Sequence, residues 1–581
     1  MKIKHYIKLP DESREIRIKV FVDEQGFREE FDTQDNNAIH FLAFAEDNTA
    51  IGTCRIFQAD AEGEYYLGRL AVLREYRGLA VGRHLIDAAE KYAVSVGGHS
   101  IRLHSQLHAK GFYEKCGYTA FGEIEPEEGC PHIWMIKNLI DNLQELGMSS
   151  IKIEREINVV ASYDTVVCGG GPAGWIAAVS SARSGKKTAL IEKYGFIGGT
   201  ATAGYVVPIS GFFFNGKRVV GGIAWEFVNE LEKLDAAFVE YPKGHVSVNP
   251  EYYKLVARRM LEESGVDLYT NSYVSDCIMD GKRVTHVVIN SKNGSEAIEG
   301  KCFIDATGDA DLFARCGAPM MEKINELQPM SLCFVITGVD TSTDLLKNCI
   351  HHDGKHGNSL NKVIHNYLVE AGKSEEVPQF GGPWFNVLLK GNSIAVNITR
   401  AEADASDRSS YTKAEGKLHR DMFTIVDLLK KEYPEFKDAE IVVSGFNAGV
   451  RETRNIKGVY TLTNEDFKKG IEYACPVAQC AHPMDIHKAK DDDQILIYLD
   501  KNSYVPYETM VSYSLDNVIA AGRCISAESE PYASLRVQAT LMSIGECAGL
   551  AASLACDSGC HVNALPLTEL KSMIDSRGCV L

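Results

Sequence analysis

Hydrophobic positions in the first 140 residues follow strand and helix patterns in turn. Three apolar runs predict neighbouring strands, at residues 40–46, 50–58 and 65–73. An amphipathic helix is predicted at 76–97 from the helical spacing of Leu79, Gly82, Leu85, Ile86 and Ala89. Shorter patterns predict a strand at 101–106, a short helix at 108–117 and a last strand at 131–138. This part of the chain therefore has the pattern of a self-contained α/β domain.

A polar segment, NLQELGMSS (142–150), interrupts the pattern and predicts a linker. Beyond it, strand and helix patterns continue to the C-terminus without a similar break and without an internal repeat. At 581 residues the chain is too long for a single core, so more than one domain is expected.

The stretch VVCGGGPAGWIAA (166–178) carries the first chemical signal. Gly169, Gly171 and Gly174 match G-x-G-x-x-G, between an apolar strand and a small-residue helix that begins with Pro172 and Ala173. The next strand ends at Glu192, 18 residues past Gly174, where an acid binds ribose hydroxyls. Backbone amides and the dipole at such a helix start favour phosphates. The segment therefore predicts a dinucleotide site.

Composition excludes several classes of function. The formal net charge of −18 argues against a nucleic-acid partner, because phosphate binding needs clustered Lys and Arg. The N-terminus lacks an apolar signal core, and the apolar stretch 539–555 carries Glu546 and many Ser and Gly, so no membrane span is expected. Sixteen Cys without a CxxC pair or metal-ligand spacing predict no metal site and a reducing, cytoplasmic location.

Five ordered motifs extend the dinucleotide signal to about residues 151–570. They are EKYGFIGGTATAG (192–204), DATGDADLFARCGAP (305–319), GVRETRNIKGVYTLTNEDF (449–467), HPMDIH (482–487) and AGRCISAESEPYASLRVQATLMSIGECAGLAA (521–552). Together they resemble FAD-dependent oxidoreductases of the glutathione-reductase-like class, related to fumarate-reductase-type flavoproteins. That class builds its FAD domain from separated segments of the chain.

The resemblance implies a set of FAD-binding residues. The ADP half of FAD would lie at the glycine loop, 169–174, and at Glu192. Gly198, Gly199 and Thr200 would approach the pyrophosphate and flavin, and Asp309 would lie near ribityl or pyrophosphate oxygens. The pyrimidine side of the flavin ring would face Gly522 and Arg523. It would also face a helix start near 538–540, which carries Gln538 and Ala539. A helix N-terminus there stabilises negative charge on the flavin.

Two flavin chemistries are disfavoured by the same motifs. The sequence GGTATAG (198–204) has no Cys pair, which argues against thiol–disulfide exchange. No His stands between Glu192 and Gly204, so noncovalent FAD is expected. A second glycine fingerprint for NAD(P)H is absent, and the source of electrons stays open.

Charged residues in two later motifs are candidates for substrate chemistry. Arg451 and Arg454 would share one face if RETR is helical, and they form either an anion clamp or a structural ion-pair node. In HPMDIH, a His–Asp pair that includes His487 would orient an imidazole for acid–base catalysis. The alternatives there are a metal site and ordinary polar loop groups. Further candidates for proton transfer are Glu452, His482, Asp485, Tyr504 and Arg523. The segment GYVVPISGFFF (204–214) is either a pocket wall or core.

The first 139 residues carry a second resemblance. A predicted strand runs into Arg77, Gly78, Leu79, Ala80, Val81 and Gly82 and then a helix, and successive amides at a helix start form a pyrophosphate cradle. This resembles the acetyl-CoA signature Q/R-x-x-G-x-G/A of the GNAT acetyltransferases, with Ala80 where the signature has Gly. Residues 20–44 and 103–135 resemble the small ElaA-type branch. Tyr113 matches the family's thiolate-protonating Tyr, and the candidate bases are Glu64, His104 and His108.

The predicted fold is therefore α/β: a GNAT domain at 1–140, a linker at 141–150, and a Rossmann-like FAD domain at 151–330 and 501–581 with an inserted α+β substrate domain at 331–500. The predicted function is bifunctional: an FAD-dependent oxidoreductase acting on a small molecule, fused to an acetyl-CoA-dependent N-acetyltransferase. The alternatives are an inert GNAT domain, or a flavin- and CoA-binding sensor or scaffold. The oligomeric state stays open.

Overall fold

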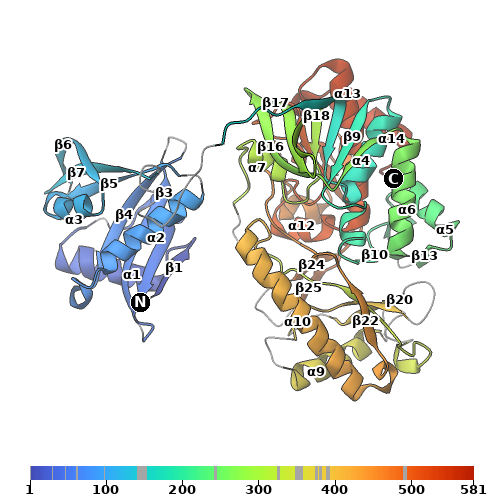
Figure 1. Ribbon diagram of the computed structural model, residues 1–581, viewed down its shortest axis with the longest axis horizontal. Helices are drawn as coiled ribbons and strands as arrows, with labels where there is room; N and C mark the ends of the chain where they lie inside the picture. Colours follow the sequence, from blue (N-terminus) through green and yellow to red (C-terminus); the bar gives the residue numbers. More distant parts are fainter. Residues whose placement is uncertain are drawn as a thin grey trace. The chain divides into compact units, whose positions relative to one another are not determined.

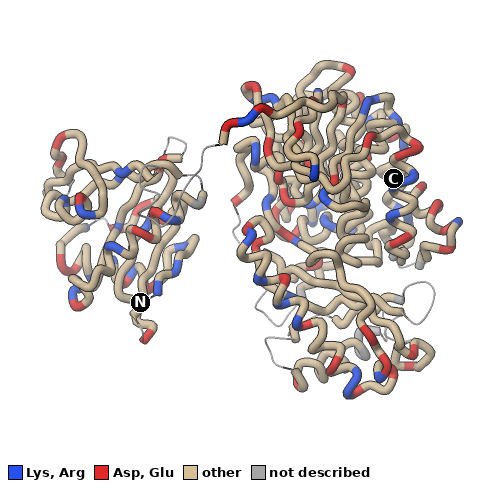
Figure 2. Tube along the Cα trace, viewed as in Figure 1, with Lys and Arg blue, Asp and Glu red and all other residues tan. Residues whose placement is uncertain are grey.

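The structure is a computed structural model, and it divides into two compact units, Met1–Arg155 and Glu156–Leu581, called here the first and second units (Figure 1). The residues it describes are 2–28, 30–45, 47–59, 63–96, 98–127, 129–139, 153–240, 245–322, 327–346, 357–372, 377–378, 382–387, 393–487 and 494–581. The linker predicted at 141–150 lies outside the described residues. Lys and Arg are interspersed with Asp and Glu over both units (Figure 2).

The first unit is one seven-stranded sheet in the order β1-β2-β3-β4-β5-β7-β6. Its strands are β1 (Lys2–Tyr6), β2 (Ile39–Phe44), β3 (Ala50–Gln58), β4 (Glu64–Val72), β5 (Ser100–Gln106), β6 (Thr119–Glu127) and β7 (Cys130–Asn138). Its helices are α1 (Asp11–Arg17), the π-helix η1 (Ile18–Glu24), α2 (Val81–Ser95) and α3 (Lys110–Lys115), with 3-10 turns η2 (Thr33–Asn36), η3 (Arg74–Tyr76) and η4 (Leu107–Ala109). The strands predicted at 40–46, 50–58 and 65–73 are confirmed as neighbours, whereas β1 and β6 were not predicted.

The amphipathic helix predicted at 76–97 begins later than its apolar pattern suggests. Helix α2 starts at Val81, and Leu79 is 64% exposed outside it, so its assignment to the buried helical face was wrong. Leu85, Ile86 and Ala89 are fully buried against the sheet, as predicted. Leu79 instead belongs to the loop between β4 and α2, where a turn and not helical periodicity decides its direction.

The second unit is built on a sheet in the order β15-β9-β8-β18-β17-β16, with β27 also paired to β18. The strands β15 (Asp267–Thr270), β9 (Thr188–Glu192), β8 (Val159–Cys168), β18 (Gly294–Asp305) and β27 (Val518–Ala520) run parallel. The last two, β17 (Arg283–Ser291) and β16 (Tyr273–Asp280), are antiparallel. Parallel strands of this kind bring their carboxyl ends to one edge, where loops bind ligands.

Two helices pack closely beside this sheet, α4 (Pro172–Arg183) and α13 (Gln538–Ser558). Glycines allow the approach: a Cβ on Gly545 would lie 2.2 Å from the carbonyl oxygen of Ala173, and one on Gly549 would lie 2.4 Å from that of Ala177. Helix α13 is the one described helix long and apolar enough to cross a membrane, and 94% of its apolar window is buried inside the unit. Core helices pass the same test of length and composition.

A smaller sheet forms the lower layer of the second unit, in the order β20-β21-β19-β22 (Figure 1). Its strands are β19 (Phe334–Thr337), β20 (Trp384–Val387), β21 (Ile394–Asn397) and β22 (Glu440–Ser444), and α9 (Gly357–Ala371) and α10 (Arg408–Glu432) cover it. These elements fall within the predicted insertion at 331–500. Its core is separate from that of the large sheet.

The remaining elements of the second unit are short and connect or extend these layers. The helices are α5 (Gly222–Glu232), α6 (Pro250–Glu263), α7 (Asp311–Arg315), α11 (Asn464–Lys469), α12 (Ser529–Leu535) and α14 (Leu567–Arg577). The strands are β10 (Pro208–Ile209), β11 (Phe213–Phe214), β12 (Lys217–Arg218), β13 (Ala237–Glu240), β14 (His245–Val248), β23 (Pro476–Cys480), β24 (Met484–His487), β25 (Gln494–Ile497) and β26 (Ser503–Pro506). The 3-10 turns are η5 (Gly199–Ala201), η6 (Pro434–Phe436), η7 (Tyr507–Thr509) and η8 (Val562–Ala564).

Candidate functional site

A cavity of about 1370 Å³ lies at the carboxyl edge of the parallel strands in the second unit. Residues from all three segments predicted to bind a dinucleotide line it: Gly169, Gly171, Pro172, Ala173, Glu192, Gly199, Thr200, Asp309, Gly522, Arg523 and Gln538. The structure thus brings together positions more than 350 residues apart in the chain. Gly174, Gly198 and Ala539 lie beside this lining and not in it.

The glycine loop has the backbone shape that close approach of a phosphate requires. Gly169 adopts φ +104°, and a Cβ there would lie 2.4 Å from the carbonyl oxygen of Ala306 on the neighbouring strand end. A Cβ on Gly174 would lie 1.8 Å from the carbonyl oxygen of Gly169. A Cβ on Gly171, by contrast, would meet nothing within 4 Å, because this glycine faces the cavity. The first two positions hold the turn, and the third leaves room for a ligand.

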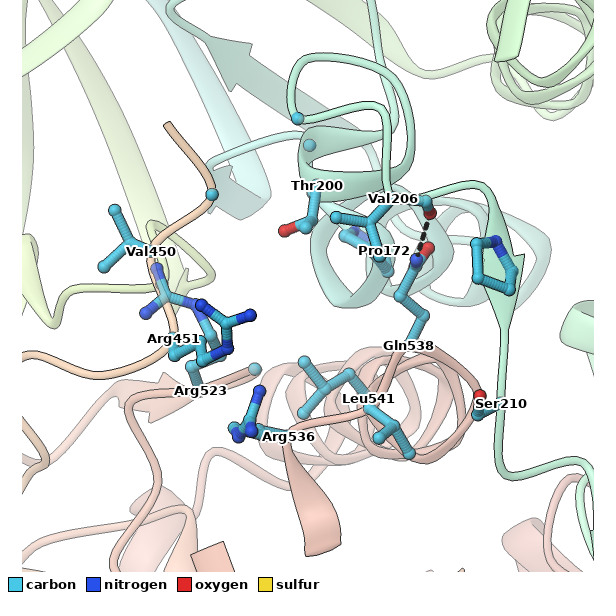
Figure 3. Close-up of a pocket in the computed structure, with 18 of the residues that line it drawn as sticks. Pro172, Thr200, Val206, Ser210, Val450, Arg451, Arg523, Arg536, Gln538 and Leu541 are labelled. Atoms are coloured by element: carbon cyan, nitrogen blue, oxygen red, sulfur yellow. Dashed lines mark hydrogen bonds between the residues drawn. The ribbon is translucent and has the colours of Figure 1, made fainter. Parts of the chain in front are cut away.

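Two helix N-termini open onto the same cavity. Helix α4 begins at Pro172 and α13 begins at Gln538, the start predicted from the sequence, and neither has a side-chain cap. Their first amides therefore remain available to an anion, and each helix dipole favours negative charge there. The side-chain amide of Gln538 donates to the carbonyl oxygen of Val206 at 2.9 Å, while its buried Oε1 accepts from no described residue (Figure 3).

Glu192 is held by backbone amides beside the glycine loop. Its Oε2 accepts from the amide of Gly170 at 2.6 Å and its Oε1 from that of Tyr194 at 2.9 Å. Burial raises the pKa of Glu192, and those two hydrogen bonds oppose the rise. The carboxylate is fixed at the end of β9, in the place predicted for a ribose-binding acid.

Asp309 forms hydrogen bonds with two residues from later parts of the chain. Its Oδ1 accepts from Thr453 Oγ1 at 2.6 Å and from Arg523 Nη2 at 3.0 Å. Burial alone raises the pKa of Asp309, but the charge of Arg523 and the hydrogen bond from Thr453 outweigh it, so the pKa lies below its usual value. The carboxylate therefore stays charged and holds Arg523 at the cavity wall.

Three more arginines line the cavity near Arg523: Arg400, Arg451 and Arg536. Arg400 and Arg451 each donate Nη1 to Ser331 Oγ, at 2.8 and 2.7 Å, which brings their charges side by side. Figure 3 shows Arg451, Arg523 and Arg536 converging on one part of the pocket. The group Arg400, Arg451 and Arg536 is called the arginine cluster below.

The arginine cluster is short of anionic partners. Arg400 is 7% exposed, and its Nε and Nη2 have no hydrogen-bond partner among the described residues. Burial lowers the pKa of Arg400 to about 10. Burial and the charges of Arg400 and Arg536 lower the pKa of Arg451. Among the described residues, the carboxylate that reaches the cluster is that of Asp485, whose Oδ2 lies 3.9 Å from Arg536 Nη2.

Arg454 does not join this cluster. Residues 451–455 are not helical, so the condition under which Arg451 and Arg454 would share one face is not met. Arg454 turns away to donate Nε to the carbonyl oxygen of Asp309 at 2.8 Å and pairs with Asp311. It lies outside the cavity lining and ties α7 to the chain that carries Arg451.

The HPMDIH segment places a histidine–aspartate pair at the cavity wall. His487 Nε2 lies 2.9 Å from Asp485 Oδ2, as the predicted pairing required, and His482 also lines the cavity. Burial and then the charge of Arg451 lower the pKa of His487 to about 3, so the imidazole is neutral. No cluster of three or more metal-ligating side chains occurs within the described residues.

Some of the other residues predicted from the sequence line the cavity, and others do not. Tyr205, Val206, Pro208, Phe213 and Phe214 line the cavity, so the segment 204–214 forms part of its wall. Glu452 and Tyr504 are not among the lining residues. Glu452 accepts from the amide of Gln328 at 3.2 Å and lies 5% exposed, as a structural acid.

In the first unit, the loop predicted to bind pyrophosphate precedes α2. Gly78 has φ +85°, and Ala80, the N-cap of α2, has φ +59° without a side-chain cap. Ala80 thus adopts the left-handed conformation that glycine takes without cost. Arg77 is held at the loop by Val72, whose carbonyl oxygen accepts from Nε at 2.9 Å, and by Glu24 at 2.7 Å. The departure from the signature leaves the loop's shape intact.

The other GNAT candidates are spread around the sheet. Tyr113 on α3 packs against Phe112 and Tyr118, and burial raises its pKa, so it keeps its proton. Glu64 pairs with Arg102 at 3.0 Å, and His108 is exposed on η4. His104 on β5 stacks on Trp134 with ring centroids 4.5 Å apart.

Comparison with known proteins assigns both units. Residues 164–574 match the family described as FAD dependent oxidoreductase, and residues 8–139 match the acetyltransferase (GNAT) domain. A putative acetyltransferase of Bacillus subtilis (strain 168) is 38% identical over 128 residues, which are 21% of this chain and 85% of that protein.

Solved structures show likeness to each part. A putative N-acetyltransferase from Lactobacillus plantarum is 31% identical and covers 24% of this chain and 97% of its own, with a TM-score of 0.23. A geranylgeranyl bacteriochlorophyll reductase-like protein from Thermoplasma acidophilum is 14% identical and covers 72% of this chain and 84% of its own, with a TM-score of 0.37. The chain is therefore an enzyme of the FAD dependent oxidoreductase family that carries a GNAT acetyltransferase domain ahead of its oxidoreductase region.

Proposed function

We propose that the second unit holds FAD noncovalently and oxidises or reduces a small molecule that bears a carboxylate. The site binds the substrate through this carboxylate. FAD, when bound, supplies the centre that accepts or donates a hydride. The glycine loop, the start of α4 and Glu192 fit its ADP half, and the open start of α13 fits the pyrimidine end of its ring. The absence of His between Glu192 and Gly204 supports the noncovalent form.

The arginine cluster carries the proposal about substrate. Burying a guanidinium without an anion is costly, and Arg400 leaves two nitrogens unpartnered among the described residues at a cavity wall. A carboxylate between Arg400 and Arg451 would satisfy both groups with charge-assisted, bidentate hydrogen bonds. Arg454, which a sequence pattern alone would add to this clamp, is already bound to Asp311.

The His487–Asp485 pair fits a positioning role beside that carboxylate. The pKa of His487, lowered to about 3, keeps the ring neutral at ordinary pH. One ring nitrogen is fixed by Asp485, which sets the orientation of the imidazole. The pair therefore orients substrate by hydrogen bonding and adds no second positive charge to the site.

For the first unit we propose N-acetyltransfer from acetyl-CoA. The amine nitrogen forms a bond to the acetyl carbon, and the carbon–sulfur bond breaks. One amine proton passes to a base, for which Glu64, His104 and His108 are the candidates. The departing thiolate takes a proton from Tyr113, which regains one from solvent. Burial raises the pKa of Tyr113, so its phenol carries a proton at the moment the thiolate departs. The loop at 77–82 would cradle the pyrophosphate of CoA with the first amides of α2.

Covalent fusion of the two units raises the concentration of one site's product near the other. We therefore propose that the two sites share a small-molecule substrate, in a cytoplasmic setting that keeps the cysteines reduced. Two alternatives are a GNAT domain that is catalytically inert, and a flavin- and CoA-binding sensor or scaffold with little turnover.

Anaerobic screening of the flavin-loaded protein tests the oxidoreductase proposal. Carboxylates should change the rate of flavin bleaching or reoxidation at least tenfold more than their neutral amides. The substitution Arg400→Gln should raise the KM for the carboxylate substrate at least tenfold. Arg408→Gln, which replaces an exposed arginine on α10, should leave this KM unchanged. Equal rates with acids and amides would refute the carboxylate site. Only a conformational change, without turnover, would favour the sensor.

A further inference from the structure

Two cysteines from different elements of the second unit lie with their sulfur atoms side by side. Cys277 is on β16, the edge strand of the large sheet, and Cys316 is the C-cap of α7. Their Sγ atoms are 3.4 Å apart, and both thiols are free. A disulfide joins its sulfurs at about 2.05 Å, so an approach of about 1.4 Å would be needed to form one. The pair is therefore placed for a disulfide without being joined by one.

Proximity alone does not make two thiols reactive, because an oxidant must also reach them. A second close pair, Cys547 on α13 and Cys579, has its Sγ atoms 3.7 Å apart, but both residues are fully buried. Burial raises the pKa of Cys547 well above its usual value, which keeps that thiol protonated and inert. Cys277 and Cys316 are each half-buried, so solutes can approach this pair from solvent.

The two half-buried thiols also differ from each other in acidity. The hydrogen bond between the two sulfurs and the charge of Arg315 lower the pKa of Cys277, against the opposing effects of burial and Asp276. The same hydrogen bond and burial raise the pKa of Cys316. Cys277 is therefore the better nucleophile of the two, and Cys316 keeps its proton and donates it in the hydrogen bond.

The elements that carry the pair also form part of the cavity wall. Tyr273 and Val274 on β16 and Asp311 at the start of α7 line the cavity, whereas Cys277 and Cys316 are not among the lining residues. An oxidant in solvent can therefore meet the thiols without entering the cavity. A bond between the two sulfurs would tie together two elements of its wall.

We propose that Cys277 and Cys316 form a reversible disulfide when they meet hydrogen peroxide, with Cys277 as the attacking thiol. The Cys277 thiolate attacks one peroxide oxygen; a sulfur–oxygen bond forms, the oxygen–oxygen bond breaks, and the hydroxide that leaves takes a proton to become water. The Cys316 sulfur then attacks the sulfenic acid on Cys277, the sulfur–sulfur bond forms, and the hydroxyl leaves as a second water with the proton of Cys316. The two thiols together lose two electrons, which reduce one peroxide to two waters.

A small thiol such as glutathione reverses the step. One glutathione thiolate attacks a sulfur of the disulfide, a second attacks the mixed disulfide, and the products are the dithiol and oxidised glutathione. In a reducing setting the pair therefore rests as two thiols and becomes a disulfide only while peroxide is present.

Peptide mapping of the full-length protein tests the proposal. The protein is reduced, freed of reductant and exposed to hydrogen peroxide, and the remaining thiols are then alkylated in denaturant before mass spectrometry. We expect Cys277 and Cys316 in one linked peptide pair, lighter by two hydrogen atoms than the separate peptides, and its disappearance after glutathione. The linkage should form at least tenfold faster than one between Cys547 and Cys579. Free thiols at Cys277 and Cys316, equally fast linkage of the buried pair, or a linkage that glutathione does not reverse overturns the proposal.

Serine variants test the order of attack. Cys316→Ser keeps a hydrogen-bond donor beside Cys277 but removes the second thiol, so the sulfenic acid should persist on Cys277 and be trapped by dimedone. Cys277→Ser should abolish the linkage and give at least fivefold less dimedone adduct on Cys316. Cys560→Ser, which removes an exposed cysteine, is the matched control and should leave the linkage unchanged. No adduct on Cys277 in the first variant, or an equal adduct on Cys316 in the second, overturns the proposal.

Discussion

Glu546 makes the stability of the second unit depend on pH in a calculable way. It lies in the middle of α13, 2% exposed, and its Oε2 accepts from the amide of Ile223 at the start of α5 at 2.8 Å. Burial raises the pKa of Glu546 from 4.5 to about 7. Between these values the unfolded chain releases a proton that the folded chain keeps. The contribution to stability is therefore present below pH 4.5 and is lost as the pH rises to about 7.

The size of the loss follows from the shift. A difference of about 2.5 pKa units, at about 1.4 kcal/mol per unit, corresponds to about 3 kcal/mol, of which about 2.5 kcal/mol is lost between pH 5 and pH 8. Glu546→Gln keeps the volume and the hydrogen-bond acceptor but cannot ionise. Its stability relative to wild type should therefore increase by about 2–3 kcal/mol over the same interval.

Calorimetric melting at pH 5 and pH 8 provides the assay. For a unit of this size the change corresponds to a relative shift in Tm of roughly 2–4 °C. Glu569→Gln, an exposed acid on α14, is the control and should follow the wild-type profile. If Glu546→Gln shows the same loss between pH 5 and pH 8 as wild type, the carboxyl does not titrate in this range, and the reasoning is refuted.

Three further predictions address the packing of α13 on α4, the loop at 77–82 and His487. Gly545→Ala should lower stability by about 1–3 kcal/mol and weaken FAD retention in denaturant titrations, because the added methyl group meets the carbonyl oxygen of Ala173 at 2.2 Å, while Gly416→Ala on α10 should be neutral or stabilising. Ala80→Gly should raise stability in urea unfolding by up to about 1 kcal/mol by relieving the left-handed backbone, and lower stability would contradict that account. Because the pKa of His487 is lowered to about 3, its contribution to stability is lost as the pH falls below 6.5. Between pH 7 and pH 5, the free energy of unfolding measured in urea should therefore fall by about 2 kcal/mol less in His487→Gln than in wild type. An equal fall in both proteins would count against a neutral buried ring.

The dinucleotide loop could be predicted from sequence because its signal is local. Gly169 and Gly174 are required by contacts a few atoms away, and strand–turn–helix order predicts where a dinucleotide would lie. The start of α13 at Gln538 agrees with the helix start near 538–540 that the family resemblance implied. Ala80 shows the limit of a motif, because it departs from the glycine signature and still adopts the backbone conformation that glycine would take.

The arginine cluster was only partly predictable. Arg400 follows β21 and stands in no motif, and Arg536 precedes α13 inside the motif 521–552, where no pattern singled it out. They meet Arg451 because Ser331 and Gln328 from a third part of the chain accept their hydrogen bonds. Arg454 would share a face with Arg451 only in a helix, and the irregular backbone there turns it to Asp311 instead. Side-chain convergence of this kind depends on tertiary packing, which periodicity does not encode.

The pairing of β8 with β18, and of β18 with β27, has a consequence for synthesis of the chain. The first unit has all of its strands once residue 155 has left the ribosome. The oxidoreductase unit, in contrast, must wait for residues 518–558, because its first glycine turn is closed by the last strand and the last long helix. During translation the first unit can therefore fold while the sheet of the second unit is still incomplete, and truncation near the C-terminus should disrupt the second unit and leave the first intact.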